Sequence, residues 1–368
     1  MTSRALSKFK FFNCEFNNFS AFKRYCTQLQ YAKPKKEAHS PVMIDEVVKY
    51  MNLSPGETIV DMTFGSGGHS RKLLETIPNI KIYALDRDPL AYEFAENLAL
   101  EYPGQVIPLL GRFSELPELL KGRNVPGNTI DGILFDFGCS SMQFDTGMRG
   151  FSISRNGPLD MRMDGERFPN QPTAADIIEK ASEEDLARII KVYGEEKEAK
   201  KIARVLVESR FTLKKLRTTR ELAEIVKSAI SDEEDDTEAI GRQKHCATKT
   251  FQAFRIFVNN ELNEINYGLF IARAYLKIGG RLITLSFHSL EDLIVKRHIS
   301  GNFMGSQINK LPLKFSSYGT SFSENELNDY ENSNWHMLHP HVLVPEPDEI
   351  EINPRSRSAR FRAMVKVS

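Results

Sequence analysis

Short apolar runs alternate with segments of helical spacing in the first part of the chain. Apolar runs that predict four strands lie at 58–61, 80–86, 105–111 and 130–136. Helical periodicity follows the first two runs, at 70–77 and 89–102. Strands separated by helices predict a parallel, doubly wound sheet, which binds its ligands outside the carboxyl ends of the strands. We expect this sheet domain to begin near His39.

The pattern changes after residue 145, where the alternation of strands and helices stops. Helices are predicted at 173–179, 182–193, 197–209 and 219–230. One long helix over 247–277 and a buried strand over 281–287 then resume the first pattern, and the chain end alternates like an edge strand. We therefore predict a sheet domain in two parts, 39–145 and 246–368, interrupted by a helical substrate-binding subdomain at 146–245.

Composition narrows the classes of protein that fit this pattern. The 368 residues suffice for a large core with an insertion, and 41% are apolar with no run near eighteen residues, so no membrane span is expected. Lys+Arg and Asp+Glu are equal at 49 each, so any surface for nucleic acid must be a local patch. The four cysteines are scattered, and His336, His339 and His341 lack acids or thiols nearby, so we expect no metal site.

Residues 1–38 differ from the rest of the chain. They hold eight basic residues against two acids, with many Phe and Asn between them. This acid-poor composition predicts a mitochondrial transit peptide, and hence a protein of the mitochondrial matrix. A disordered basic arm that contacts RNA is the alternative.

A glycine-rich loop after the first strand suggests the kind of ligand. Gly65, Gly67 and Gly68 follow the strand that ends at Asp61, and a helix begins directly after them. A dinucleotide fingerprint has a third glycine where this chain has Ser70, and Asp61 would repel a pyrophosphate. A cationic ligand suits the loop better, and S-adenosylmethionine carries both an ammonium and a sulfonium. A dehydrogenase or another nucleotide-binding protein is the alternative.

Other strand ends add candidate site residues. Asp86 ends the second strand about twenty residues beyond the loop, where an acid binds the ribose hydroxyls of a nucleotide. Phe113 follows the third strand and either stacks on an adenine or belongs to the core. Asp136 ends the fourth strand and faces the same crevice.

Basic residues supply candidate contacts with RNA. The loop at 149–164 is rich in Gly, Pro and Arg without periodicity, and loops of that length are usually functional. The tail at 353–366 carries five basic residues and no acid, which suits phosphate binding or protection of a sheet edge. The residues we expect to contact RNA are Arg149, Arg162, His288, Arg355, Arg357 and Arg360.

Ten motifs in unbroken order resemble one family. Among the most specific are Asp61-Met-Thr-Phe-Gly-Ser-Gly-Gly-His69, Asp160-Met-Arg-Met-Asp164, Phe257-Val-Asn-Asn-Glu-Leu262 and Ser286-Phe-His-Ser-Leu-Glu-Asp292. With them the chain resembles the small-subunit rRNA cytosine-N4 methyltransferases of the MraW/RsmH type from His39 nearly to its end. The resemblance implies a Rossmann-like class I S-adenosylmethionine-dependent fold with a helical insertion. It also implies cofactor contacts from Gly67, Gly68, His69, Asp86, Phe113, Asp136 and Gln143.

The activity that this resemblance implies is methylation of cytidine N4 in mitochondrial small-subunit rRNA, in support of ribosome assembly and translation. An assembling small subunit is the expected partner, and a homodimer is compatible with the family. The protein would orient the exocyclic amine in line with the sulfonium, and Asp136 or a nearby backbone carbonyl would accept the amine proton. The alternatives are an RNA-binding assembly factor with little catalysis and a cytosine-C5 methyltransferase that uses Cys139 as nucleophile. The chain departs from the bacterial pattern in its basic N-terminal extension, in the acidic run at 232–238 and at Cys139.

Overall fold

The structure is a computed structural model that describes residues 41–212, 215–230, 245–301 and 335–367. The predicted transit peptide at 1–38 and the acidic run at 232–238 lie outside the described residues. No helix in the described part of the chain is long and apolar enough to cross a membrane.

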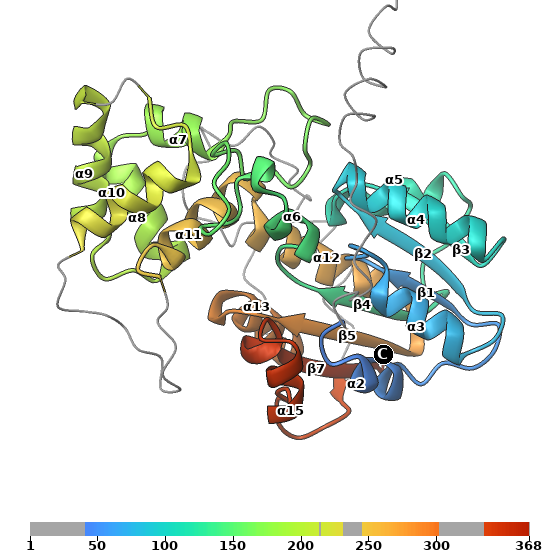
Figure 1. Cartoon of the computed structure of the whole chain (residues 1–368). Helices are drawn as coiled ribbons and strands as arrows, with labels where there is room; N and C mark the ends of the chain where they lie inside the picture. The colour runs from blue at the N-terminus through green and yellow to red at the C-terminus, as the bar shows by residue number, and fades with distance from the viewer. Residues whose placement is uncertain (1–40, 213–214, 231–244, 302–334, 368) are drawn as a thin grey trace, which may run out of the picture. The chain divides into compact units, whose positions relative to one another are not determined.

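Seven strands of the described residues form one sheet in the order β3-β2-β1-β4-β5-β7-β6 (Figure 1). They are β1 (Thr58–Asp61), β2 (Lys81–Asp86), β3 (Val106–Leu110), β4 (Ile130–Asp136), β5 (Leu276–Ser286), β6 (Trp335–Met337) and β7 (Arg360–Lys366). The first five are parallel, whereas β7 is antiparallel to both β5 and β6. The predicted Rossmann-like sheet is therefore confirmed.

Alternating side chains send the strands' apolar residues into two cores, one on each face of the sheet. Ile59 and Ile82 join the core beneath α2 (Ile44–Met51), α3 (Gly68–Thr76) and α4 (Pro89–Glu101). Val60 and Phe135 point the other way, into a core shared with α5 (Leu116–Lys121) and α12 (Glu261–Tyr275). The second core continues without a break into the helices of the insertion. Shorter elements are η1 (Phe113–Glu115), α6 (Ser141–Asp145), η2 (Gly147–Arg149), α15 (Pro347–Ile352) and η3 (Ser356–Ser358), and α13 (Ser289–Ser300) follows β5.

The insertion is helical, as the periodicity predicts. Its helices are α7 (Ala174–Lys180), α8 (Glu183–Gly194), α9 (Ala199–Thr212) and α10 (Thr219–Ala229). The side chains of Thr173, Ser182 and Thr218 accept backbone hydrogen bonds at three helix starts, which explains why those helices begin where they do. In addition, α11 (Thr248–Asn259) packs against α8, so the helical layer extends beyond residue 245.

Three expectations about the second half of the chain were wrong. The single helix over 247–277 is two helices, because Asn260 adopts a left-handed conformation (φ 51°) between α11 and α12. The strand expected at 281 begins at Leu276, and Gly279 (φ 83°) bends its backbone within the strand. The C-terminal strand is not an edge, since β6 pairs with its outer side.

Candidate functional site

Four polar side chains meet where β1, β2 and β4 end. β1 lies between the other two strands, so Asp61, Asp86 and Asp136 reach the same end of the sheet. His69 joins them from the first turn of α3. The predicted strand-end acids thus lie at one end of the sheet, and we call their surroundings, together with His69, the strand-end site.

Asp61 holds the start of α3 against the sheet. Its carboxylate is buried and accepts hydrogen bonds from Oγ of Ser70 at 2.7 Å and from the amide of Thr63 at 3.1 Å. Burial raises the pKa of Asp61, and the hydrogen bond from Ser70 lowers it. Ser70 occupies the position of the third glycine in a dinucleotide fingerprint, and its hydroxyl explains why that position is polar here.

Asp86 fixes the glycine loop to the second strand. Its two carboxylate oxygens accept from the amide of Gly65 at 2.8 Å and from the amide of Asp88 at 2.9 Å. Burial raises the pKa of Asp86 to about 7, although both amides lower it. Gly65 has a φ of 55°, a conformation that favours glycine, so loop geometry and the acid are coupled.

The other two glycines of the loop are required by packing within the protein. A Cβ on Gly67 would lie 2.5 Å from the Phe64 ring, and one on Gly68 would lie 2.4 Å from Pro41. Pro41 is the first residue that the structure describes, so the segment just before α2 packs directly on the loop. The bunched glycines therefore let the loop fold tightly onto its neighbours.

His69 and Asp136 carry polar atoms that the described residues do not satisfy. Nε2 of His69 lies 3.6 Å from Oδ2 of Asp136, and the histidine side chain is 8% exposed. Both ring nitrogens of His69 and Oδ1 of Asp136 are buried without a hydrogen-bond partner in the described part of the chain. Because buried polar groups usually have partners, these atoms indicate the place of a ligand.

Phe113 and Gln143, two residues implied by the resemblance, contact residues next to the strand ends. The ring of half-buried Phe113 meets Phe135 edge-on at 5.2 Å, and a Cβ on Gly268 would lie 3.2 Å from it. The amide of buried Gln143 donates to Asp88 at 2.9 Å. Phe113 thus packs at the border of the hydrophobic core, next to the end of β4. Gln143 stabilises the turn after β2 through its hydrogen bond to Asp88.

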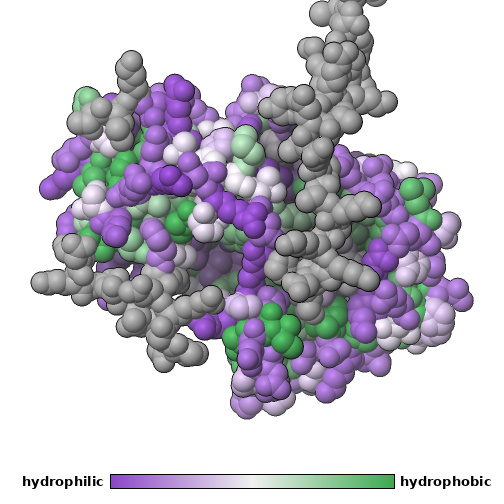
Figure 2. All heavy atoms as spheres, viewed as in Figure 1, coloured by the Kyte–Doolittle hydropathy of each residue, from purple (hydrophilic) through white to green (hydrophobic). Residues whose placement is uncertain are grey.

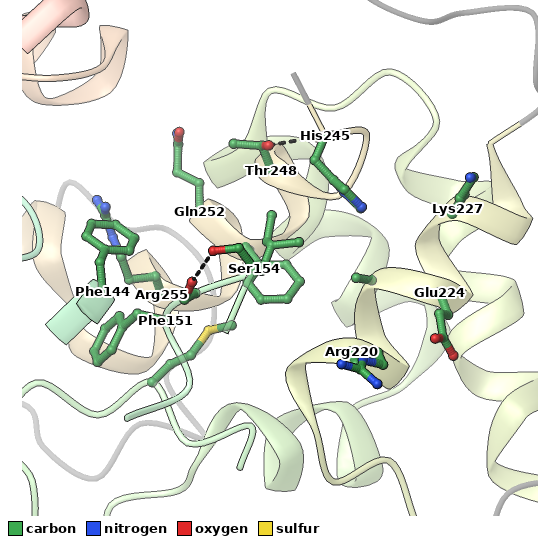
Figure 3. A pocket seen from close by; sticks show the side chains of 15 residues that line it. Phe144, Phe151, Ser154, Arg220, Glu224, Lys227, His245, Thr248, Gln252 and Arg255 are labelled. Atoms are coloured by element: carbon green, nitrogen blue, oxygen red, sulfur yellow. Dashed lines mark hydrogen bonds between the residues drawn. The ribbon is translucent and has the colours of Figure 1, made fainter. Parts of the chain in front are cut away.

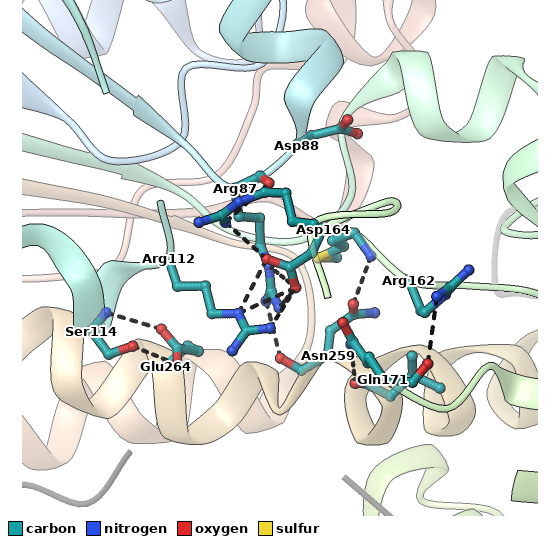
Figure 4. A network of polar contacts seen from close by, with 12 residues as sticks. Arg87, Asp88, Arg112, Ser114, Arg162, Asp164, Gln171, Asn259 and Glu264 are labelled. Atoms are coloured by element: carbon teal, nitrogen blue, oxygen red, sulfur yellow. Dashed lines mark hydrogen bonds and ion pairs between the residues drawn. The ribbon is translucent and has the colours of Figure 1, made fainter. Parts of the chain in front are cut away.

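A buried ionic cluster joins the loop after β4 to the sheet (Figure 4). Asp164 is fully buried and pairs with three arginines: Arg87, Arg112 at 3.1 Å and Arg167 at 3.2 Å. Burial alone would raise the pKa of Asp164. Arg87 and Arg112 together lower it by more than burial raises it, so the pKa lies below its usual value. Arg87 directly follows Asp86, so the Asp160-Met-Arg-Met-Asp164 motif reaches the Asp86 side of the strand-end site.

Asn259 fixes the same loop from the helical side (Figure 4). Its amide nitrogen donates to the carbonyl of Met161 at 2.7 Å, and its oxygen accepts from the amide of Met163 at 2.7 Å. Met161 has a φ of 63°, which is rare for a residue with a side chain. The end of α11 thus holds the loop in a conformation that it would not adopt alone.

A second buried cluster lies behind Gly138. Arg255 of α11 donates two hydrogen bonds of 2.9 Å to Glu261, and Glu291 lies 3.8 Å from its guanidinium. Burial raises the pKa of the Cys139 thiol to about 12. Arg255, which faces the thiol, lowers this pKa, but its effect is smaller than that of burial. The thiol therefore stays protonated near neutral pH, which does not suit a nucleophile.

If the chain transfers methyl groups, as the resemblance implies, we predict that Cys139→Val changes the rate by less than about threefold, because the side chain is only partly buried and its protonated thiol is not needed as a nucleophile. Steady-state rates on an rRNA substrate would test this. A loss of several orders of magnitude, together with a protein–RNA adduct on a 5-fluorocytidine substrate, would instead identify Cys139 as a nucleophile.

Three of the residues predicted to contact RNA are engaged within the protein. Arg149 pairs with Asp88 at 2.7 Å and donates to two backbone carbonyls of the 149–164 loop. Arg162 pairs with Asp160 at 2.7 Å, and His288 caps α13 while its ring lies 2.9 Å from Glu291. These side chains stabilise loops, so their geometry argues against RNA contact as their main role.

The basic tail is partly neutralised by acids. Arg355 pairs with Asp145 at 2.9 Å, and Arg360 lies 3.4 Å from Asp292, yet both side chains remain at least 40% exposed. Arg357 is half-buried in η3.

His339, one of the three clustered histidines of the sequence, is held by internal hydrogen bonds. Its Nε2 accepts from the amide of Ala363 at 2.9 Å.

Sequence reasoning missed the two buried clusters. Asp164 and Asn259 lie in two of the family-like motifs, but spacing along the chain does not show which groups they meet. Within the motifs, charged residues that alternate with methionines, as in Asp160-Met-Arg-Met-Asp164, were the one hint of a buried charge.

Comparison with known proteins connects these features with a family. The MraW methylase family model matches residues 36–367. A Drosophila melanogaster protein named probable methyltransferase-like protein 15 homolog is 53% identical over 332 residues, which cover 90% of this chain and 93% of that protein. The Mus musculus 12S rRNA N(4)-cytidine methyltransferase METTL15 is 46% identical over 353 residues, 94% of this chain and 86% of that protein.

A third relative is much longer than this chain. It is a Culex quinquefasciatus protein named putative receptor-type tyrosine-protein phosphatase mosPTP-1, which is 56% identical over 329 residues. The match covers 89% of this chain but 22% of that protein, so the name of the whole protein does not describe the matched part. The family model and the fly and mouse relatives confirm the resemblance seen in the motifs: this chain belongs to the MraW methylase family.

Proposed function

We propose that this protein transfers a methyl group from S-adenosylmethionine to N4 of a cytidine in small-subunit rRNA, in the mitochondrial matrix and on an assembling small subunit. One structural observation carries the proposal: unsatisfied polar atoms of His69 and Asp136 converge at the strand ends of a methylase-family sheet. The names of the fly and mouse relatives support the reaction and the substrate. The basic composition of residues 1–38 supports the compartment.

The strand-end site fits S-adenosylmethionine chemically. Asp86 would bind the ribose hydroxyls, and His69 and the amides of the Gly65–Gly68 loop would face the amino-acid part of the cofactor. Asp61 supplies negative charge beneath the loop, and Phe113 and Gln143 border the adenine side. When bound, S-adenosylmethionine supplies an activated methyl group on a positively charged sulfur.

Asp136 is the residue best placed to assist the incoming amine. The lone pair of cytidine N4 is delocalised into the ring, so an acceptor that attracts an amine proton makes the nitrogen a better nucleophile. Oδ1 of Asp136 has no partner among the described residues, and the side chain is 28% exposed at the crevice. The carboxylate can therefore accept a hydrogen bond from the amine and take its proton as the N–C bond forms. The base must be unpaired or flipped to reach this position.

We predict that cofactor affinity increases by about five- to tenfold from about pH 6 to pH 8, because ribose hydroxyls bind the carboxylate form of Asp86 and its pKa is raised to about 7. The raised pKa also affects the stability of the protein without cofactor. Between the ordinary pKa of about 4 and the folded pKa of about 7, Asp86 holds a proton in the folded protein but not in the unfolded chain, so its contribution to the free energy of unfolding falls as pH rises through this range. Calorimetry with S-adenosylmethionine measures the effect. Asp86→Asn should bind more weakly and without this pH dependence. If Asp86→Asn kept full affinity, another residue would bind the ribose.

The proposal is tested by mapping N4-methylcytidine in mitochondrial small-subunit rRNA from cells with and without the protein. Loss of one modified cytidine, restored by the intact chain and not by Asp136→Asn, would support it. Restoration of ribosome assembly by Asp136→Asn without the modification would instead favour an assembly factor with little catalysis.

A further inference from the structure

A cavity of about 610 Å³ lies beside the strand-end site, between the 149–164 loop and helices α10 and α11 (Figure 3). Three phenylalanines are among its lining residues: Phe144, which is partly exposed, and the more deeply set Phe151 and Phe251. Its volume is in the range of small-molecule and cofactor sites. None of Asp61, His69, Asp86 and Asp136 lines it, so the cavity is distinct from the strand-end site.

The two ends of the cavity differ in character (Figure 3). Phe144, Phe151 and Arg255 lie at one end, the two rings 6.5 Å apart and nearly perpendicular. Arg220 and Lys227 lie at the other end, on one exposed face of α10. Glu224 lies between them, so this face keeps a net positive charge.

The cations of α10 are available to a ligand. Arg220 and Lys227 are exposed, and neither has an ion pair with an acid of the described residues. Arg255, in contrast, is neutralised by Glu261 at 2.9 Å. The cavity therefore combines aromatic walls with free positive charge at one mouth, which is the combination that binds a nucleotide of single-stranded RNA.

The cavity also lies close to the reacting end of the sheet. Nη1 of Arg255 lies 3.9 Å from the position of a Cβ on Gly138, two residues after Asp136. Phe144 directly follows Gln143 in α6. A base in the cavity would thus be a near neighbour of a base at Asp136, without occupying the same place.

We propose that this cavity binds an unstacked base that flanks the target cytidine on the same RNA strand, with Arg220 and Lys227 contacting the backbone phosphates. The inference rests on the proposed function, since it assumes that the target base enters at Asp136. The helical insertion would then hold the RNA strand on one side of the methylated nucleotide. The phenylalanines of the cavity would stack on this flanking base. The protein would then select its target cytidine partly through the identity of the neighbouring nucleotide.

Charge reversal on α10 tests the phosphate contacts. The double variant Arg220→Glu, Lys227→Glu changes only exposed side chains, so folding should be kept. We expect at least about tenfold weaker binding of a fluorescent fragment of small-subunit rRNA, and a salt slope reduced by about 0.7 per lost contact. The double variant Lys200→Glu, Arg204→Glu makes the same change of charge on exposed side chains of α9 outside the cavity, so it is the matched control and should change neither quantity. Equal effects of the double variant and the control would overturn the proposal.

Crosslinking tests the position of the base without requiring methyl transfer. Single 5-iodouridines are placed along the rRNA fragment that the full chain binds most tightly, and crosslinked peptides are identified by mass spectrometry. A crosslink to Phe144, Phe151 or Phe251 from one position beside the bound cytidine is the expected result. Crosslinks confined to the 353–366 tail would overturn the proposal. Because this readout needs binding alone, it separates failure of the cavity assignment from failure of the proposed activity, which cofactor calorimetry and methylation assays report.

Discussion

Replacing Asp136 by asparagine should lower the rate of methyl transfer by about 10²- to 10⁴-fold, the usual contribution of a proton acceptor in the transition state. Asparagine keeps the shape of the side chain and can accept a hydrogen bond, but it does not take the amine proton. Because the missing step follows binding, kcat should fall far more than the affinity for RNA. Single-turnover rates at saturating S-adenosylmethionine measure the chemical step directly.

Asp131 provides the matched control on the same strand. It lies in β4 with Asp136, but it accepts from the amide of Thr58 at 2.7 Å and pairs with Lys277. Asp131→Asn should affect stability slightly and leave the chemical rate unchanged. If Asp136→Asn retained more than about a tenth of the rate, a backbone carbonyl near the strand end would be the better candidate for the acceptor.

Replacing Asp164 by alanine should destabilise the protein by about 3–5 kcal/mol, because it leaves buried guanidinium groups without their counter-charge. Arg87 and Arg112 are 12% and 4% exposed, so water cannot replace the carboxylate. Urea unfolding would measure the loss. The pKa of Asp164 is lowered in the folded protein, so its contribution should be complete above about pH 4 and vanish as pH falls through the folded pKa.

An exposed pair shows how much of this effect depends on burial. Arg71 and Glu101 also form an arginine–carboxylate pair, at 2.7 Å, but their side chains are 43% and 52% exposed. Glu101→Ala should leave the urea midpoint almost unchanged, because water screens an exposed pair. Similar losses for Asp164→Ala and Glu101→Ala would mean that the buried cluster adds no more than a surface pair.

The elements that depend on local pattern could be predicted from the sequence. The parallel strands, the capped helices of the insertion and the acids at the strand ends all follow from periodicity and from residues next to one another. The placement of Phe113 at the crevice needed the family resemblance, since its position suits a core residue equally well.

Features that depend on contacts between distant segments could not be predicted. The helix break at Asn260 does not follow from periodicity, and the side chain of Asn259 beside it binds the distant backbone of residues 161 and 163. The inner position of β7 depends on β6, which is three residues long and too short for a periodic pattern. The ion pairs of Arg149 and Arg162 were not predicted either, since Asp88 is distant from Arg149 in the chain and Asp160 meets Arg162 only once the loop has folded.

The antiparallel pairing of β7 with β5 has a consequence for the order in which the protein assembles. β5 is complete long before its outer neighbour, since α13, β6 and α15 precede β7 in the chain. During synthesis, or during passage through a narrow channel with the N-terminus leading, the backbone groups along that side of β5 stay open to pairing with another molecule. Pairing of β7 therefore covers the open side of β5. A chaperone would protect this protein most in the interval before β7 has paired.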